Sequence, residues 1–256
     1  MGAGKLDTDK FLKYGYVPHK DTGEWPDEAW MFSASHTLEY SYGAYAVAQM
    51  AKALGKEEDY ERLMELSEGW EHLYDTKLNL IHPRLENGKF IDNFNPMQVW
   101  RGFQEGNAYQ YTFYVPHNPK GLIDKMGAKE FTNRLDSIFI WSEDKIFSGG
   151  TTVDAFAGLQ TYYNQGNEPC LHISWLFNDA GRPSLTQKWV RAILDKFYGT
   201  DGIHGYGYGQ DEDQGMLGAW YVMSSIGLFD VCGLNDINSD FSLGSPQFDK
   251  ITIKLN

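Results

Sequence analysis

Three consecutive carboxylates, Asp211, Glu212 and Asp213, stand between two glycines, Gly209 and Gly215. Like charges so close together are not expected in a core without partners. One interpretation makes Asp213 the N-cap of the helix that follows, because the exposed N–H groups of a helix start favour anions. The other is a sugar site, since the approach over 202–208 is rich in glycine and tyrosine, and flat aromatic faces, hydroxyls and carboxylates suit such a site.

A further carboxylate, Glu105, is flanked by Phe103, Tyr109 and Tyr111. Partial burial among aromatic rings raises the pKa of a carboxyl group and makes it a proton donor. Two carboxyl groups on opposite sides of a sugar ring, one protonated and one ionised, are the minimum for glycoside hydrolysis. Taken alone, Glu105 is better interpreted as a helix-start glutamate favoured by the helix dipole.

Asn167 and Glu168 precede Pro169 in a third polar stretch. Glu168 is either the cap of a helix that begins near Cys170 or, with Asn167, an oxygen ligand for a hard cation such as calcium. The histidines lack metal-binding spacing and are expected to bond to neighbours or to sugar hydroxyls; those considered are His36, His117, His172 and His204.

Helical periodicity predicts the elements that position these stretches. A helix over 35–54, with Leu38, Met50 and Leu54 in its inward stripe, and a second over 57–74 are joined so closely that they must form an antiparallel hairpin. Other helices are predicted near 106–115, 119–126, 127–141, 151–163, 184–198 and 213–226. Short strands are predicted at 229–232, 240–244 and 250–255, so the fold class is mainly α: helical hairpins over 1–228 and a β segment over 229–256.

Composition narrows the classes of partner. The 256 residues are 42% hydrophobic and 22% charged, which is typical of a globular protein, and 15% aromatic, which suits a carbohydrate groove. The net charge of −13 argues against nucleic acid and anionic membranes. No apolar run is long enough to insert in a membrane, and no signal peptide is visible. Two distant cysteines, Cys170 and Cys232, fit either buried thiols or one bridge.

Taken together, the stretches resemble glycoside hydrolase family 92, the calcium-dependent exo-acting α-mannosidases. The resemblance runs from about Ser35 to the C-terminus and keeps its motifs in order. They are Thr37-Leu38-Glu39-Tyr40, Glu105-Gly106-Asn107-Ala108-Tyr109-Gln110-Tyr111, Val115-Pro116-His117, Gly166-Asn167-Glu168-Pro169, Ala180-Gly181-Arg182-Pro183, Asp211-Glu212-Asp213 and Ala219-Trp220-Tyr221-Val222.

The resemblance implies an (α/α)6 barrel preceded by a β-sandwich, and hydrolysis that inverts the anomeric centre. Glu105 matches the general acid, and Asp213 the general base with Asp211 beside it. Asn167 and Glu168 match the region that supplies calcium ligands, and the calcium would hold mannose hydroxyls and favour a flattened ring. The substrate is expected to be terminal, α-1,2-linked mannose of a glycan, and the residues expected to bind it are Asn107, Gln110, Tyr111, His117 and Trp220.

The chain also departs from the family. Gly43-Ala44 and Leu217-Gly218 replace residues common in it, which affects substrate contacts rather than the acid and base. About eight helical patterns are found where a closed double ring needs twelve, so an incomplete barrel is expected. The β-sandwich portion or another chain is the expected protein partner, and the chain is expected to be a fragment, a natural truncation or one part of a larger assembly. Two alternatives follow: a non-catalytic glycan-binding remnant, and a metal-free inverting enzyme of another (α/α)6 family, such as a glucosidase. The resemblance suggests a secreted or periplasmic location.

Overall fold

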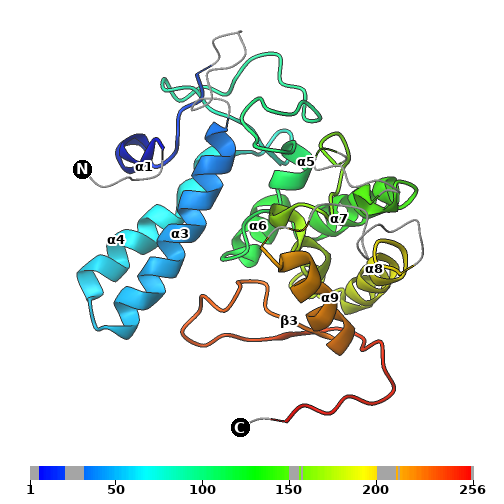
Figure 1. Cartoon of the computed structure of the whole chain (residues 1–256). Coiled ribbons are helices and arrows are strands. Elements are labelled where there is room, and N and C mark those ends of the chain that lie inside the picture. The colour runs from blue at the N-terminus through cyan, green and yellow to red at the C-terminus, as the bar shows by residue number, and fades with distance from the viewer. Residues whose placement is uncertain are drawn as a thin grey trace. The chain divides into compact units, whose positions relative to one another are not determined.

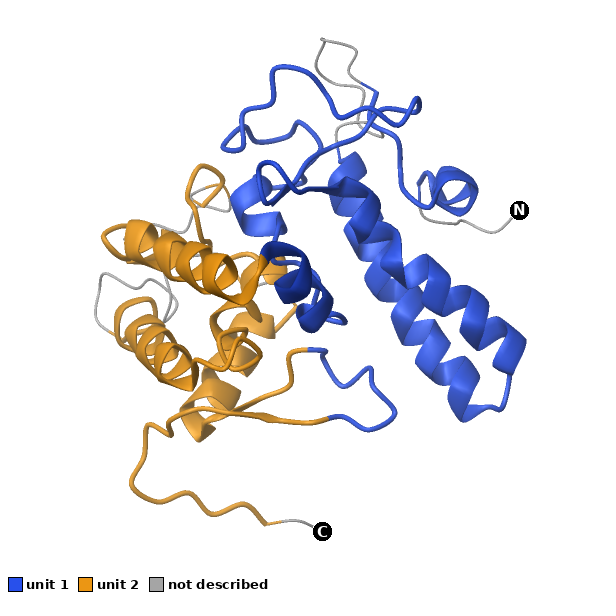
Figure 2. Ribbon diagram, turned by 180° about the vertical axis from the view of Figure 1, so that it is seen from behind, with its two compact units in different colours: residues 1–126, 232–239 blue, residues 127–231, 240–256 orange. Residues whose placement is uncertain are grey.

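The computed structural model describes residues 6–20, 32–149, 156, 158–200, 212 and 214–254. The chain forms two compact units (Figure 2). Unit 1 comprises residues 1–126 and 232–239, and unit 2 comprises 127–231 and 240–256. The described elements are mostly helical, which confirms the predicted class. The segment 229–256, predicted as a separate β segment, is shared between the two units.

Unit 1 contains the predicted helical hairpin, formed by α3 (Ser33–Ala53) and α4 (Glu57–Ser67), which run side by side in Figure 1. Gly55 adopts a left-handed φ of 68° directly after α3, so the chain reverses within a few residues. The buried face of α3 is built from small side chains, including Ser41, Ala44 and Ala48. The predicted inward positions Met50 and Leu54 are wrong, since both are 63% exposed. The buried positions of α3 carry mainly small side chains, whereas these two larger side chains lie exposed at the C-terminal end of the helix.

The rest of unit 1 is short helices and turns. Helix α1 (Thr8–Tyr14) precedes the hairpin, and the 3₁₀ helix η1 (Glu68–Leu73) follows it. Strands β1 (Tyr74–Asp75) and β2 (Leu80–Ile81) pair antiparallel. A turn follows at Asn87-Gly88, across which the Leu85 N–H donates to the Lys89 carbonyl. The predicted helix after Gly106 is only the single turn α5 (Ala108–Tyr111), whereas α6 (Pro119–Met126) has its predicted bounds.

Unit 2 packs α7 (Ala128–Glu143) and α8 (Pro183–Lys196) around an aromatic core. Phe139 stacks on Trp189 at 5.4 Å between ring centroids and meets Tyr163 at 4.4 Å. The connections carry the 3₁₀ helices η2 (Ile146–Ser148), η3 (Glu168–Cys170) and η4 (Ile173–Trp175), and the last helix is α9 (Met216–Ile226).

Strands β3 (Leu228–Phe229) and β4 (Ser242–Leu243) pair antiparallel in unit 2. The predicted strand at the end of the chain is wrong for residues 251–254, which pair with nothing in the described structure. In the predicted helix over 151–163, the described residues 156 and 158–163 form turns instead. No helix in the described ranges is both long enough and apolar enough to span a bilayer.

Candidate active site

Glu105 lies in a turn of unit 1 just ahead of α5, and its backbone is left-handed, with φ of 51°. A non-glycine residue in this region costs roughly 1–2 kcal/mol, because Cβ approaches the carbonyl oxygen. Such strain persists only where neighbours enforce it, and it is concentrated at functional sites. The expected partial burial is not found: Glu105 is exposed, while Phe103 and Tyr111 belong to the core.

The residue that precedes Glu105, Gln104, is held at both of its backbone polar groups. The Gln104 N–H donates to Ser35 Oγ over 2.9 Å, and the Tyr111 hydroxyl donates to the Gln104 carbonyl over 2.6 Å. Ser35 is 2% exposed and Tyr111 is 4% exposed, so both partners are fixed by the surrounding core. These two hydrogen bonds fix the backbone of Gln104, the residue directly before Glu105.

The residues after Glu105 are equally constrained. A Cβ at Gly106 would lie 2.7 Å from Gln110 Oε1 and 2.9 Å from the Tyr111 ring, so only glycine fits. Asn107 is fully buried, and its Oδ1 caps α5 by accepting the N–H groups of Tyr109 and Gln110. Asn107, Gln110 and Tyr111, predicted to bind substrate, therefore build the scaffold that presents Glu105.

Aromatic rings connect this scaffold to His117 within unit 1. Tyr111 meets Tyr114 edge-on at 6.2 Å, Tyr114 meets Tyr42 at 6.3 Å, and Tyr42 stacks on His117 at 6.0 Å. The Tyr42 hydroxyl donates to the carbonyl of Cys232, so residues 232–239 are fixed to the same face of α3.

His117 is held as a neutral imidazole. Its Nε2–H donates to the Ser67 carbonyl over 2.9 Å, and burial lowers the pKa of His117 from 6.5 to about 4. Nδ1 is buried without a hydrogen-bond partner among the described residues. That acceptor is what a sugar hydroxyl or a water would satisfy, so the predicted contact with substrate remains a prediction.

In unit 2, the stretch with the predicted calcium ligands is a compact turn. The Asn164 side chain accepts the Gly166 N–H, and the Asn167 carbonyl accepts the N–H of Cys170. Asn167 is 9% exposed, and Glu168 is half-buried at the start of η3. The hydrogen bonds fix the backbone of this turn, and the roles of the two side chains stay predictions.

The chemistry of these two side chains fits a hard cation. An amide oxygen and a carboxylate are calcium ligands, but calcium needs six to eight oxygens. Across the described ranges, no group of three His, Cys, Asp or Glu side chains gathers to hold a metal ion. Carbonyl, amide and water oxygens, or ligands elsewhere in the protein, would have to complete the sphere.

Trp220 of α9 is a core residue of unit 2. It is 2% exposed, its Nε1–H donates to the Leu171 carbonyl over 2.8 Å, and it stacks on Tyr198 at 5.7 Å. Since Leu171 directly follows η3, this tryptophan supports the 164–171 turn. Direct contact with substrate stays a prediction.

The N-terminus of α9 is capped by Glu212. Its carboxylate accepts the N–H groups of Leu217 over 2.9 Å and Gly218 over 3.2 Å, while Gln214 and Gly215 are both left-handed. The cap is therefore Glu212, the one carboxylate of the acidic turn that had no predicted role in the site. Asp211 and Asp213 lie outside the described residues.

The family model of the glycosyl hydrolase family 92 catalytic domain matches residues 2–256. The chain belongs to glycosyl hydrolase family 92. Of its solved relatives, a GH92 α-mannosidase from Bacteroides thetaiotaomicron superposes with a TM-score of 0.79 at 32% identity, covering 96% of this chain and 30% of that one. A GH92 inverting mannosidase from the same organism gives 0.74 at 28% identity, covering 94% of this chain and 32% of that one.

A curated relative from Arthroderma benhamiae, described as an uncharacterized secreted glycosidase, is 25% identical over 94% of this chain and 31% of its own length. The chain thus spans about a third of the length of the relatives it matches. The first Bacteroides enzyme has also been solved with mannoimidazole.

Two residues of this GH92 chain were missed by reasoning from the sequence. Ser35 was predicted only as a helix start, and its bond to the Gln104 N–H joins residues 69 positions apart. Glu212 had no predicted role in the site, and its carboxylate accepts the N–H groups of Leu217 and Gly218.

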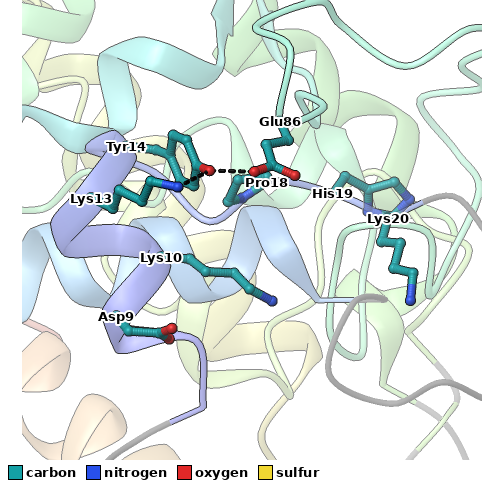
Figure 3. Close-up of a pocket in the computed structure, with 8 residues that line it drawn as sticks. All are labelled: Asp9, Lys10, Lys13, Tyr14, Pro18, His19, Lys20 and Glu86. Atoms are coloured by element: carbon teal, nitrogen blue, oxygen red, sulfur yellow. Dashed lines mark hydrogen bonds between the residues drawn. The ribbon is translucent and has the colours of Figure 1, made fainter.

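The GH92 chain also has a cavity of about 300 Å³ in unit 1, separate from the residues predicted for the site (Figure 3). Along one wall, Lys13 donates to the Tyr14 hydroxyl, which donates to Glu86. The other described lining residues are Asp9, Lys10, Pro18, His19 and Lys20. The Tyr14 hydroxyl links Lys13 to Glu86, and both acidic and basic side chains line the cavity, so it does not present a uniform cationic surface.

Proposed function

We propose that this chain supplies the acid and base of an inverting, exo-acting α-mannosidase. Glu105 protonates the leaving oxygen, and Asp213, with Asp211 beside it, activates the water that attacks C1 from the opposite face. The proposal is supported by membership of family 92, by a relative described as an inverting mannosidase, and by matching motifs at 105–111 and 211–213.

The single observation that carries the proposal is the strained, clamped conformation of Glu105. A surface glutamate without a role has no reason to occupy a conformation that glycine takes at lower cost. The surrounding hydrogen bonds aim its carboxyl group away from the core, where a substrate could meet it.

Asn167 and Glu168 are proposed to hold calcium, which when bound would neutralise charge and engage sugar hydroxyls. The chain's own residues perform the proton transfers. Their proposed substrate is terminal α-1,2-linked mannose, and the mannoimidazole complex of the relative supports mannose-type recognition. A secreted or periplasmic location is proposed from the relative described as secreted.

The decisive experiment is mannose release from an α-1,2-dimannoside, followed by NMR so that the first-formed anomer is seen. The β anomer is expected first, and Glu105→Gln should lower kcat by about 10²–10⁴-fold, as loss of general acid catalysis does. Glutamine has the same shape as glutamate but no carboxyl proton to donate. The variant is therefore expected to fold normally, and folded variant protein is the control for the loss of rate.

If folded protein binds mannosides but releases no mannose in excess calcium, the enzyme proposal is overturned in favour of a glycan-binding remnant. Activity and melting temperature that do not respond to a chelator or to added calcium would instead favour a metal-free inverting enzyme. Initial release of the α anomer would contradict inversion.

A further inference from the structure

Ser35 and Tyr111 approach the proposed acid from two different elements. Ser35 lies in the first turn of α3, and Tyr111 is the last residue of α5. Their polar atoms bind the N–H and the carbonyl of the same residue, Gln104. Both bonds therefore act on the backbone immediately before Glu105.

Tyr111 acts on both sides of Glu105. Its hydroxyl binds the peptide before this residue, and its ring lies so close to Gly106 that a Cβ there would be 2.9 Å away. With the chain fixed on each side, the intervening residue has little freedom in φ, and this accounts for its left-handed value of 51°.

The support of this clamp is itself rigid. The Gly102 carbonyl accepts the N–H groups of Ala34 and Ser35, which fixes the start of the turn against α3. Gly102 has a φ of 95°, and a Cβ there would lie 2.4 Å from Pro83, so no other residue could make this approach. On the other side, the Asn107 cap fixes α5 and hence Tyr111.

We propose that Ser35 and Tyr111 are positioning residues that hold Glu105 in its left-handed conformation and so aim its carboxyl group at the leaving oxygen. This inference rests on the proposed role of Glu105 as the acid. Neither residue needs to touch substrate, since both are nearly fully buried and each has a polar atom bound to Gln104.

The first test uses the leaving group as a reporter of proton donation. A dimannoside needs its leaving oxygen protonated, whereas a dinitrophenyl mannoside releases a phenolate that leaves without a proton. Tyr111→Phe and Ser35→Ala should each lower kcat on the dimannoside by roughly 10–100-fold, the effect of misplacing a catalytic group by up to about 1 Å. We expect KM to be nearly unchanged, and kcat on the dinitrophenyl substrate to fall much less.

Matched controls exist in the same unit. Tyr16→Phe removes another buried hydroxyl, which donates to the Leu85 carbonyl over 2.8 Å, and Ser41→Ala removes another buried serine hydroxyl of α3. Neither control should change the ratio of kcat on the dimannoside to kcat on the dinitrophenyl mannoside. In a Glu105→Gln background, Tyr111→Phe should not change this ratio further, because the acid that it positions is already absent. The proposal would be overturned if Tyr111→Phe and Ser35→Ala lowered kcat equally on both substrates, or if their ratio of kcat values equalled that of Tyr16→Phe.

The second test does not depend on activity. Glu105→Gly should raise the melting temperature, and the rise should shrink in a Tyr111→Phe or Ser35→Ala background, while staying intact with Tyr16→Phe. An undiminished rise in all backgrounds would show that the clamp does not impose the conformation. If the unmodified protein releases no mannose, the proposed function fails, and this thermal cycle still decides whether the clamp exists.

Discussion

At the scale of single residues, the left-handed Glu105 allows a test of whether its proposed catalytic role costs stability. Glycine takes this conformation without the Cβ penalty. We therefore expect Glu105→Gly to raise the free energy of unfolding by roughly 1 kcal/mol while it abolishes mannose release. Chemical denaturation measures the first quantity. Glu105→Gln, which keeps the strain, is the control and should leave stability within about 0.5 kcal/mol.

His117 should make stability depend on pH. Burial lowers the pKa of His117 from 6.5 to about 4, so between these values the unfolded chain binds a proton that the folded chain does not. Stability from this residue is complete above pH 6.5 and falls as the pH drops toward 4, by up to about 3 kcal/mol.

The measurement is urea denaturation at several pH values between 7.5 and 4.5, compared with His117→Phe. The variant keeps a ring against Tyr42 and Tyr45 but cannot be protonated. Its stability should fall less over this range. Parallel curves for the two proteins would show that His117 does not cause the dependence.

At the scale of elements, α9 depends on a side chain outside it. Glu212 supplies two acceptors to the helix start, so Glu212→Ala should lower the free energy of unfolding by about 1–2 kcal/mol. Glu65→Ala is the control, because Glu65 is an exposed glutamate within α4 and should change stability by less than about 0.5 kcal/mol. Equal effects of the two substitutions would contradict the capping role.

Elements were predictable from sequence where periodicity and a terminating residue agree. The α3–α4 hairpin is such a case, because Gly55 and the short connection leave only an antiparallel arrangement. The helix predicted over 106–115 was too long, because beyond Thr112 the backbone forms tight turns, with the Tyr114 N–H donating to the Tyr111 carbonyl and the Val115 N–H to the Phe113 carbonyl. The terminal strand failed because alternation alone provides no pairing partner.

For the candidate site, sequence motifs predict the residues, and the structure adds the contacts that support them. Motifs located Glu105, Asn167 and Glu168, whereas Ser35 acts through a contact that sequence spacing cannot show. Asn107 and Tyr111 were predicted to bind substrate, and their hydrogen bonds to α5 and to Gln104 show a structural role beside that prediction. A motif residue can be required for the position of its neighbour as well as for substrate.

At the scale of the whole molecule, the two cysteines report on the two units separately. Cys232 belongs to unit 1 and Cys170 to unit 2; both are buried thiols rather than a disulfide, and burial raises the pKa of Cys170 to about 12. Both should react slowly with a thiol reagent under native conditions, because thiolate character and access are low.

Tyr42→Phe should accelerate labelling of Cys232 several-fold and leave that of Cys170 unchanged, because the Tyr42 hydroxyl holds the Cys232 carbonyl. Mass spectrometry of labelled peptides distinguishes the two sites. Tyr16→Phe, with its hydroxyl elsewhere in unit 1, is the control. Acceleration at both cysteines would mean that the substitution loosens the chain generally.

The attachment of residues 232–239 to unit 1 also has a consequence for synthesis on the ribosome. Residues 1–126 emerge first, but the carbonyl that Tyr42 binds is made about 100 residues later. At translation rates of about 5–20 residues per second, the face of α3 waits roughly 5–20 s for its partner. During that interval the nascent chain presents Tyr42 and Tyr45 to water and to chaperones, so codon usage across the intervening segment should affect the yield of folded protein.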